Sequence, residues 1–254
     1  MKKLSILPSV RLFAFGLTYA AINWVLTSSA TAATLDLTFT QIGTINISPN
    51  NNAGTGVYRA KISDIDFDIT AIKVIDILGQ GGTPGKFSGF DLDAIKISDS
   101  LITNAEDVKR LSDSNVFDFT PNGTKLTAGT MRATTRANFR GNNLFGTKDG
   151  NVDNSIARLQ SFDAVAETNQ NAAGFVSLGD GGEILFQLTQ RVAVPKPSSI
   201  YVYIAEVGNN GERARGQVTL IGKRTRVPEP TSLLALPLIG IYLLKRMSQV
   251  NKTV

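Results

Sequence analysis

Residues 200–207 read IYVYIAEV, and this stretch indicates the class of fold. Its β-branched and aromatic residues are typical of a β-strand. Similar stretches recur along the chain at Leu35–Thr40, Asp64–Thr70, Phe90–Ser98, Val116–Thr120, Glu183–Thr189 and Arg215–Gly222. Loops rich in Gly, Asn and Pro separate them. Many short strands at this spacing predict an all-β fold, an antiparallel β-sandwich or jelly roll.

One segment breaks the β pattern. Residues 104–111, NAEDVKRL, read as a short helix, with Asn104 as its N-cap and acidic residues in its first turn. The chain has 254 residues. Its middle part, about 190 residues long, can hold one core of ordinary size or two small ones. We therefore expect a β-rich ectodomain over residues 34–226.

The N-terminus has the three parts of a secretory signal peptide. A positively charged region comes first, and an uncharged, mostly apolar region follows over Leu12–Leu26. Ala30 and Ala32 then form an A-x-A cleavage site. The basic residues of the first region are Lys2, Lys3 and Arg11. Residues 1–32 are therefore predicted to be removed by signal peptidase after Sec-type export.

A second apolar run, Thr231–Leu244, lies near the C-terminus and carries no charge. As a helix it would be about 21 Å long, whereas a bilayer core is roughly 30 Å thick. Lys245 and Arg246 follow at once, as expected of a positive membrane stop on the cytoplasmic side. A short membrane helix over residues 231–244 is favoured because the chain is exported. The alternative is a terminal helix that docks on the core.

The residues before this run are Val227, Pro228, Glu229 and Pro230. The two prolines favour an extended backbone there. Together with the apolar run and the basic pair, the motif resembles the PEP-CTERM sorting signal of bacterial exosortase substrates, also called the ice-binding protein C-terminal domain. The resemblance covers residues 227–250. It implies that exosortase, a membrane transpeptidase of a separate chain, recognises and processes this motif.

Three fragments of the middle region carry a weaker resemblance. They are GFDLDAIKIS, SLGDGGEILFQL and YIAEVGNNGE. They are similar to β-rich ectodomains of other PEP-CTERM proteins, including cyanobacterial ones. This resemblance implies an exported β-domain and brings no activity with it.

The basic character of the chain belongs to its two ends. The net charge is +5 and the sequence pI is about 9.5. Of the 26 basic residues, three lie in the signal peptide and three after Leu244, which leaves 20 between Thr34 and Val227. Of the 21 acidic residues, only Glu229 lies outside that stretch, which also leaves 20. The ectodomain is formally neutral, so nucleic acid is not an expected partner.

The chain contains no His and no Cys. Serine–histidine and cysteine–histidine catalysis are therefore excluded in their usual forms, as are imidazole and thiolate metal sites. The common nucleotide-binding and hydrolase motifs are also absent. Carboxylates remain, and a pair of them can hydrolyse glycosides. We predict that the protein is not an enzyme, with an Asp/Glu glycoside hydrolase as one alternative.

A calcium-binding loop is a more specific hypothesis for some of these acidic residues than a catalytic pair. Asp149, Asn151 and Asp153 occupy positions 1, 3 and 5 of an EF-hand-like loop. Asn154 replaces the glycine of position 6, and Gln160 replaces the bidentate glutamate of position 12. The favoured interpretation is an Asx-rich surface turn without a cofactor, and a weak calcium site is the alternative.

Acidic and aromatic residues alternate in three predicted strands. We expect the acids on solvated sheet faces, with a cation bridge between the faces as the alternative. They are Asp64, Asp66 and Asp68 in one strand, and Asp91 and Asp93 in another. Tyr201 and Tyr203 alternate on a third strand, either exposed as a sugar-stacking pair or half-buried.

Together these features predict an exported protein of the cell surface or extracellular matrix, anchored in the membrane during transit. Its expected role is structural or adhesive, without catalysis. Its expected partners are the Sec-type export machinery, signal peptidase, exosortase, the membrane and an exopolysaccharide. The alternatives are a calcium-assisted carbohydrate-binding module and the glycoside hydrolase.

Overall fold

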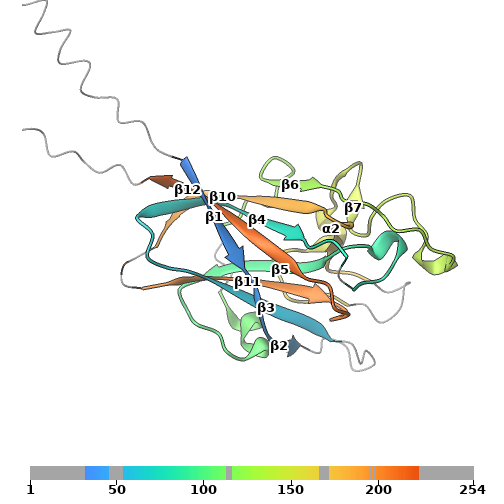
Figure 1. Cartoon of the computed structure of the whole chain (residues 1–254), viewed down its shortest axis with the longest axis horizontal. Helices are drawn as coiled ribbons and strands as arrows, with labels where there is room; N and C mark the ends of the chain where they lie inside the picture. The colour runs from blue at the N-terminus through green and yellow to red at the C-terminus, as the bar shows by residue number, and fades with distance from the viewer. Residues whose placement is uncertain are drawn as a thin grey trace, which may run out of the picture. The chain divides into compact units, whose positions relative to one another are not determined.

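Two antiparallel sheets of five strands each form the body of the protein (Figure 1). The structure is a computed structural model that describes residues 32–45, 54–79, 81–112, 116–165, 172–194, 196 and 198–222. The strand order is β1-β12-β4-β10-β6 in the first sheet and β2-β3-β11-β5-β9 in the second. The two sheets pack face to face, which confirms the predicted all-β, antiparallel sandwich.

The strands of the first sheet are β1 (Ala32–Thr38), β4 (Phe67–Asp76), β6 (Thr124–Thr127), β10 (Glu183–Ala193) and β12 (Ala214–Gly222). Those of the second are β2 (Thr40–Ile45), β3 (Thr55–Ile62), β5 (Asp91–Ser98), β9 (Val176–Ser177) and β11 (Ile200–Val207). A small hairpin, β7 (Thr147–Lys148) with β8 (Asn151–Val152), lies apart from both. Its strands are followed by the one α-helical turn of the described residues, α2 (Asn154–Ala157).

Apolar side chains from the two sheets meet in one core. Ile72, Phe186 and Val218 come from the first sheet, and Leu92 and Val202 come from the second. All five are fully buried. Each fully buried side chain of this size stabilises the fold by about 1.5–3 kcal/mol. The alternation of apolar residues within each strand therefore drives the pairing of the two layers.

The second sheet is also covered on its other face. Residues of β3, β5 and β11 that point away from the first sheet pack against η2, a 3₁₀-helix over Ala105–Arg110, and against Phe162. A cluster of phenylalanines adds to this outer layer, namely Phe87, Phe139, Phe145 and Phe175. The second sheet is therefore buried on both faces.

The observed strands agree with most of the predicted stretches. Residues 200–207 are β11 as predicted, and β12 begins one residue before Arg215. The predicted strand over Val116–Thr120 is wrong, because only an isolated bridge between Phe117 and Leu188 forms there. The predicted strand over Leu35–Thr40 is divided, because the chain passes from the first sheet to the second at Phe39. Strand β3 was not predicted.

The predicted helix at residues 104–111 forms, but as the 3₁₀-helix η2. The Asn104 side chain accepts a hydrogen bond from the N–H of Glu106, at 3.2 Å, which confirms the expected N-cap. Within the described ranges, no helix has the length and apolar character needed to cross a bilayer. The predicted membrane helix, residues 231–244, lies outside those ranges.

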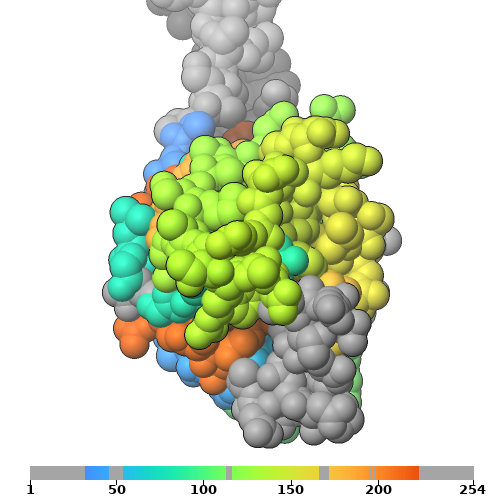
Figure 2. All heavy atoms as spheres, turned by 90° about the vertical axis from the view of Figure 1, so that its right-hand side faces the viewer, coloured from blue at the N-terminus to red at the C-terminus, as the bar shows by residue number. Residues whose placement is uncertain are grey.

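Long connections gather at one end of the sandwich. The segment between β6 and β8 spreads over this end (Figure 2). It contains η3 (Ala137–Phe139), which lies beside η1 (Gly85–Phe87). The same segment supplies Arg132, whose side chain reaches the connection after β4 and the turn before β10. This end therefore joins residues that are far apart in the sequence.

Candidate functional site

Four carboxyl side chains are buried at the end of the sandwich that this segment covers, and we call them the carboxyl cluster. Asp76 is the last residue of β4, and Asp91 is the first residue of β5. Glu206 lies near the end of β11, and Glu212 lies in the connection from β11 to β12. Their exposed fractions are 5% or less. Buried carboxyl groups are rare unless they are paired or bound to a cation, so the cluster is the candidate functional site.

Two members of the carboxyl cluster have their own hydrogen-bond donors. Asp76 accepts from the N–H of Phe90 at 2.9 Å and from the N–H of Gly181 at 2.8 Å. Asp91 accepts from the Ser177 hydroxyl. Burial raises the pKa of Asp76, while its two N–H donors lower it. Burial and the neighbouring Glu212 carboxylate raise the pKa of Asp91 well above its usual range.

The other two members, Glu206 and Glu212, lack such donors. Both are fully buried, and none of their four carboxyl oxygens has a hydrogen-bond partner of normal geometry among the described residues. Burial, and then the Glu212 carboxylate, raise the pKa of Glu206 well above its usual range. Burial raises the pKa of Glu212 to about 8. The contact between the two carboxyl groups raises the pKa of Glu206 further and lowers that of Glu212, and the N–H groups of Asn209 and Asp91 lower the pKa of Glu206 and of Glu212 respectively.

Arg132 is the one basic residue within ion-pair distance of the carboxyl cluster in the part of the chain that the structure describes. Its Nη2 lies 3.8 Å from Oε1 of Glu212, and its Nε lies 3.2 Å from Oδ1 of Asp180. The guanidinium also donates to the carbonyl oxygens of Gly81 and Thr83. Its charge is therefore shared, and among the members of the cluster it lies within ion-pair distance of Glu212 alone.

The glycine-rich stretch 81–85 closes over Glu212. A Cβ atom at Gly82, where φ is +86°, would lie 1.7 Å from Oε1 of Glu212 and 2.7 Å from Nη2 of Arg132. Only glycine fits this approach and this backbone conformation. The stretch thus shields Glu212 from water, and Arg132 holds it in place through the carbonyl oxygens of Gly81 and Thr83.

Tyr58, from β3, is the aromatic neighbour of the carboxyl cluster. Its hydroxyl lies 3.4 Å from the main-chain oxygen of Glu212 and donates to it. Its ring packs edge-on against Phe90. Burial, and then the Glu206 carboxylate, raise the pKa of Tyr58 to about 12. The phenol is therefore neutral at physiological pH.

A fifth buried acid, Asp93, lies on β5 under the outer layer and is fully buried. Its Oδ1 accepts from the N–H groups of Asp163 and Ala164, at 3.3 and 3.1 Å, while its Oδ2 has no partner among the described residues. Burial, and then the Asp163 carboxylate, raise the pKa of Asp93 well above its usual range, although Arg158 lowers it. Asp93 therefore resists ionisation in the folded protein.

This shift predicts a pH effect of Asp93→Asn. A folded-state pKa above the unfolded value gives stability that is present at acid pH and is lost as pH rises through the folded pKa. We expect the free energy of unfolding of the wild type to fall relative to that of the variant as the pH rises above about 4, the ordinary pKa of an unfolded aspartate. Urea unfolding at several pH values measures the difference. Asp66→Asn, at an exposed carboxylate, is the control for loss of one charge; a difference that does not change with pH would contradict the prediction.

The predicted calcium loop forms the β7–β8 hairpin, with Asp149 at φ +52°. The Asn151 side chain donates to the Asp149 carbonyl at 3.1 Å. Asp153 caps α2 by accepting from the N–H of Ser155, and the Ser155 hydroxyl and N–H lower the pKa of Asp153. No group of three Asp, Glu, His or Cys side chains in the described ranges is arranged to hold a metal ion. Calcium at this loop stays the untested alternative to an Asx-rich surface turn.

The expected solvated acids are placed differently. The prediction is wrong for Asp91 and Asp93, which are buried because the second sheet is covered on both faces. It is also wrong that Asp64, Asp66 and Asp68 share one strand face, because β4 begins only at Phe67. Asp64 has φ +60°, and Asp66 pairs with Lys196 at 2.9 Å.

Of the two alternatives for the tyrosine pair, the exposed sugar-stacking pair is wrong, and the half-buried one holds for Tyr201. Tyr203 is fully buried, whereas Tyr201 is half-buried. The Tyr203 hydroxyl donates to the Ser100 carbonyl and accepts from the N–H of Ile102, both at 2.7 Å. This side chain therefore ties the connection after β5 to the sheet and is not available to stack on a sugar.

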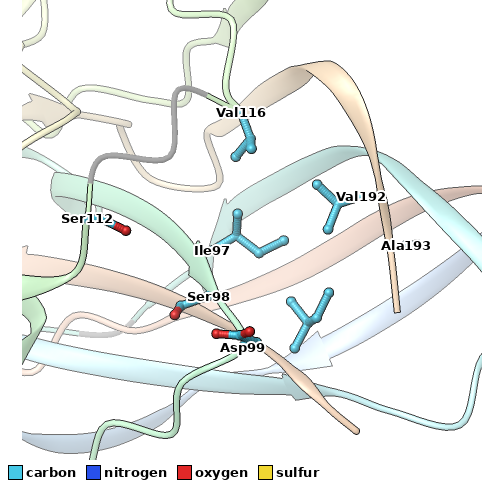
Figure 3. A pocket seen from close by; sticks show the side chains of 8 residues that line it. Ile97, Ser98, Asp99, Ser112, Val116, Val192 and Ala193 are labelled. Carbon is cyan, nitrogen blue, oxygen red and sulfur yellow. The ribbon is translucent and has the colours of Figure 1, made fainter. Parts of the chain in front are cut away.

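A separate groove of about 340 Å³ lies by the start of β11 (Figure 3). Asp99 is the one titratable side chain among the described residues that line it. The lining residues are Ile97, Ser98, Asp99, Ser112, Val116, Val192, Ala193 and Ile200. The groove thus offers a mostly apolar surface with a single carboxylate.

Comparison with protein-family models, curated proteins and solved structures gives no match to this chain. Of the predicted processing sites, Ala32 is the first residue of β1 and lies opposite Ile221 of β12. The other predicted processing and sorting residues lie outside the described ranges, namely Ala30, Val227, Pro228, Glu229, Pro230, Lys245 and Arg246.

Proposed function

We propose that this chain is an exported protein of the cell surface or extracellular matrix with a structural or adhesive role. Sec-type export and signal peptidase remove residues 1–32, and exosortase processes the C-terminal signal at Val227–Pro230. The chain is anchored in the membrane in transit by residues 231–244. An exopolysaccharide is the proposed contact partner of the folded domain.

The observation that carries this proposal is the position of the first and last strands. β1 and β12 are antiparallel neighbours, with Ala32 opposite Ile221. The two targeting segments therefore join the domain at the same end of one sheet. Among the described residues, the buried members of the core run from Leu37 to Leu220. Removal of both segments is thus compatible with a complete sandwich.

The sequence supports a role without catalysis. The chain has no His and no Cys, and its formally neutral ectodomain offers no excess charge to nucleic acid. The buried carboxyl cluster lies under the glycine-rich stretch 81–85, where a polymeric substrate has no access. A structural or adhesive surface therefore fits better than a glycoside hydrolase.

The test is the intact mass of the protein recovered from its native host. We expect the mature chain to lack Met1–Ala32 and the residues beyond the Val227–Pro230 motif. In a strain without exosortase, the C-terminal segment should be retained and the protein should stay in the membrane fraction. Replacing Pro228, Glu229 and Pro230 by alanine should have the same effect, whereas Lys252→Ala, in the tail after the signal, should be processed normally.

Two results would contradict the proposal. Retention of either end in all molecules from an exosortase-competent cell would remove the sorting function. Turnover of a polysaccharide by the purified protein, lost on substitution of an Asp or Glu, would replace the structural role by a glycoside hydrolase.

A further inference from the structure

We propose that Glu206 and Glu212 bind one divalent cation, calcium, inside the carboxyl cluster. This site is separate from the loop at Asp149. It does not depend on the proposed function, because a bound ion would stabilise the domain whatever its role at the cell surface.

The first argument is the lack of hydrogen-bond partners. All four carboxyl oxygens of the pair are buried, and none accepts a hydrogen bond of normal geometry from a described donor, while the two carboxyl groups lie against each other. Asp76 and Asp91 beside them are hydrogen-bonded. Buried polar atoms in proteins almost always have a partner, because an unmade bond leaves the full cost of desolvation. Within the carboxyl cluster, the shortage of hydrogen-bond donors is therefore confined to Glu206 and Glu212.

The second argument is charge. Arg132 approaches Glu212 only at 3.8 Å, and its guanidinium also serves Asp180 and two main-chain carbonyl groups. No described basic side chain lies within ion-pair distance of Glu206. A divalent cation between the two carboxylates would neutralise both of them, and bound cations are the usual partners of buried carboxylates that lack a counter-charge.

The third argument concerns which cation fits. Only two carboxylate side chains face each other, so they supply up to four oxygen ligands, and main-chain carbonyls and water must supply the rest. The stretch at Gly81 meets the 209–211 turn here, where a Cβ at Gly81 would lie 2.5 Å from the Asn210 carbonyl oxygen. Calcium accepts bidentate carboxylates and carbonyls in irregular geometry, whereas magnesium requires a near-ideal octahedron. The oxygen-only surroundings disfavour zinc.

The test uses the full chain, unfolded in chelator and refolded with or without millimolar calcium, since a buried ion exchanges slowly. At a hundredfold excess over Kd, we expect calcium to raise the thermal midpoint by about 5–10 °C. Glu206→Gln with Glu212→Gln should abolish the shift and still fold, because glutamine keeps the shape and removes the buried charge. Asp66→Asn, at an exposed carboxylate, is the matched control and should keep the shift.

A second measurement detects the ion directly. Terbium replaces calcium in oxygen sites and luminesces when a nearby tyrosine is excited. Tyr58 lies against Glu212, so terbium bound by the pair should luminesce on tyrosine excitation. Tyr58→Phe should lose most of this signal and keep the calcium-dependent midpoint. Excess calcium should quench the signal of the wild type.

Three outcomes would overturn the proposal. One is a midpoint that does not respond to calcium. Another is a response that persists in the Glu206→Gln, Glu212→Gln variant. The third is a response that disappears in an Asp149→Asn, Asp153→Asn variant and not in the glutamate variant, which would assign the calcium to the β7–β8 loop.

Discussion

Phe186→Ala is expected to lower the free energy of unfolding by about 3–5 kcal/mol. Phe186 lies in β10, in the middle of the core, and is fully buried. Its ring contacts those of Phe117 and Phe119, with centroids 5.8 and 6.0 Å apart. Truncation removes this buried area and leaves a cavity that the rigid strands around it cannot fill. A typical domain is stable by about 5–15 kcal/mol, so the variant should be close to unfolding.

Urea unfolding of the variant and the wild type measures this effect. Leu78→Ala is the control, because Leu78 is also a large apolar residue but is 67% exposed. Its substitution should change stability by less than about 0.5 kcal/mol. A loss below about 1 kcal/mol at Phe186 would show that the two sheets do not pack around this ring as described.

Gly182→Ala should lower the free energy of unfolding by a similar amount, for a different reason. A Cβ at this position would lie 1.9 Å from the Leu178 carbonyl oxygen and 2.7 Å from the Gly129 nitrogen. These atoms belong to main chain that cannot move aside easily, because Gly129 donates to that same carbonyl at 2.9 Å. The Gly182 carbonyl in turn accepts from the N–H of Asp76. The added methyl group overpacks this site and strains two hydrogen bonds. We therefore expect the free energy of unfolding to fall by about 3–5 kcal/mol.

Gly150→Ala is the matched control for this variant. Gly150 has φ +77° and no atom within 4 Å of the added Cβ, so its substitution has only a backbone cost of about 1–2 kcal/mol. Thermal or urea unfolding of both variants separates the steric effect from the conformational one. Equal losses for the two variants would contradict the close approach of the three main-chain segments at Gly182.

The sequence predicts the strands well where composition is strong. IYVYIAEV is β11 because it combines β-branched and aromatic residues with turn residues on both sides. Thr55–Ile62, TGVYRAKI, also forms a strand, although it contains glycine and two basic residues. It becomes β3 because it pairs along its whole length with β11. This pairing is a tertiary interaction, which the β-propensity of the segment itself does not reveal.

The candidate site was less accessible to sequence reasoning. Alternating acids in a strand indicate a solvated face only where one face of the sheet is open, and the second sheet is covered on both faces. Asp91 was therefore placed in solvent when it is buried. Glu206 and Glu212 are six positions apart, but Asp76, Asp91 and Arg132 join them only through the order of the strands. No local sequence pattern indicates that these residues lie together in the fold.

The interior position of β12 in its sheet has a mechanical consequence. β12 lies between β1 and β4 and is paired with both along most of its length. Any tension on the chain beyond Gly222 enters the domain along this strand. The hydrogen bonds of both ladders then lie across the direction of pull and are loaded together, in shear, and do not open one after another. A domain tethered through this strand is suited to bearing tension.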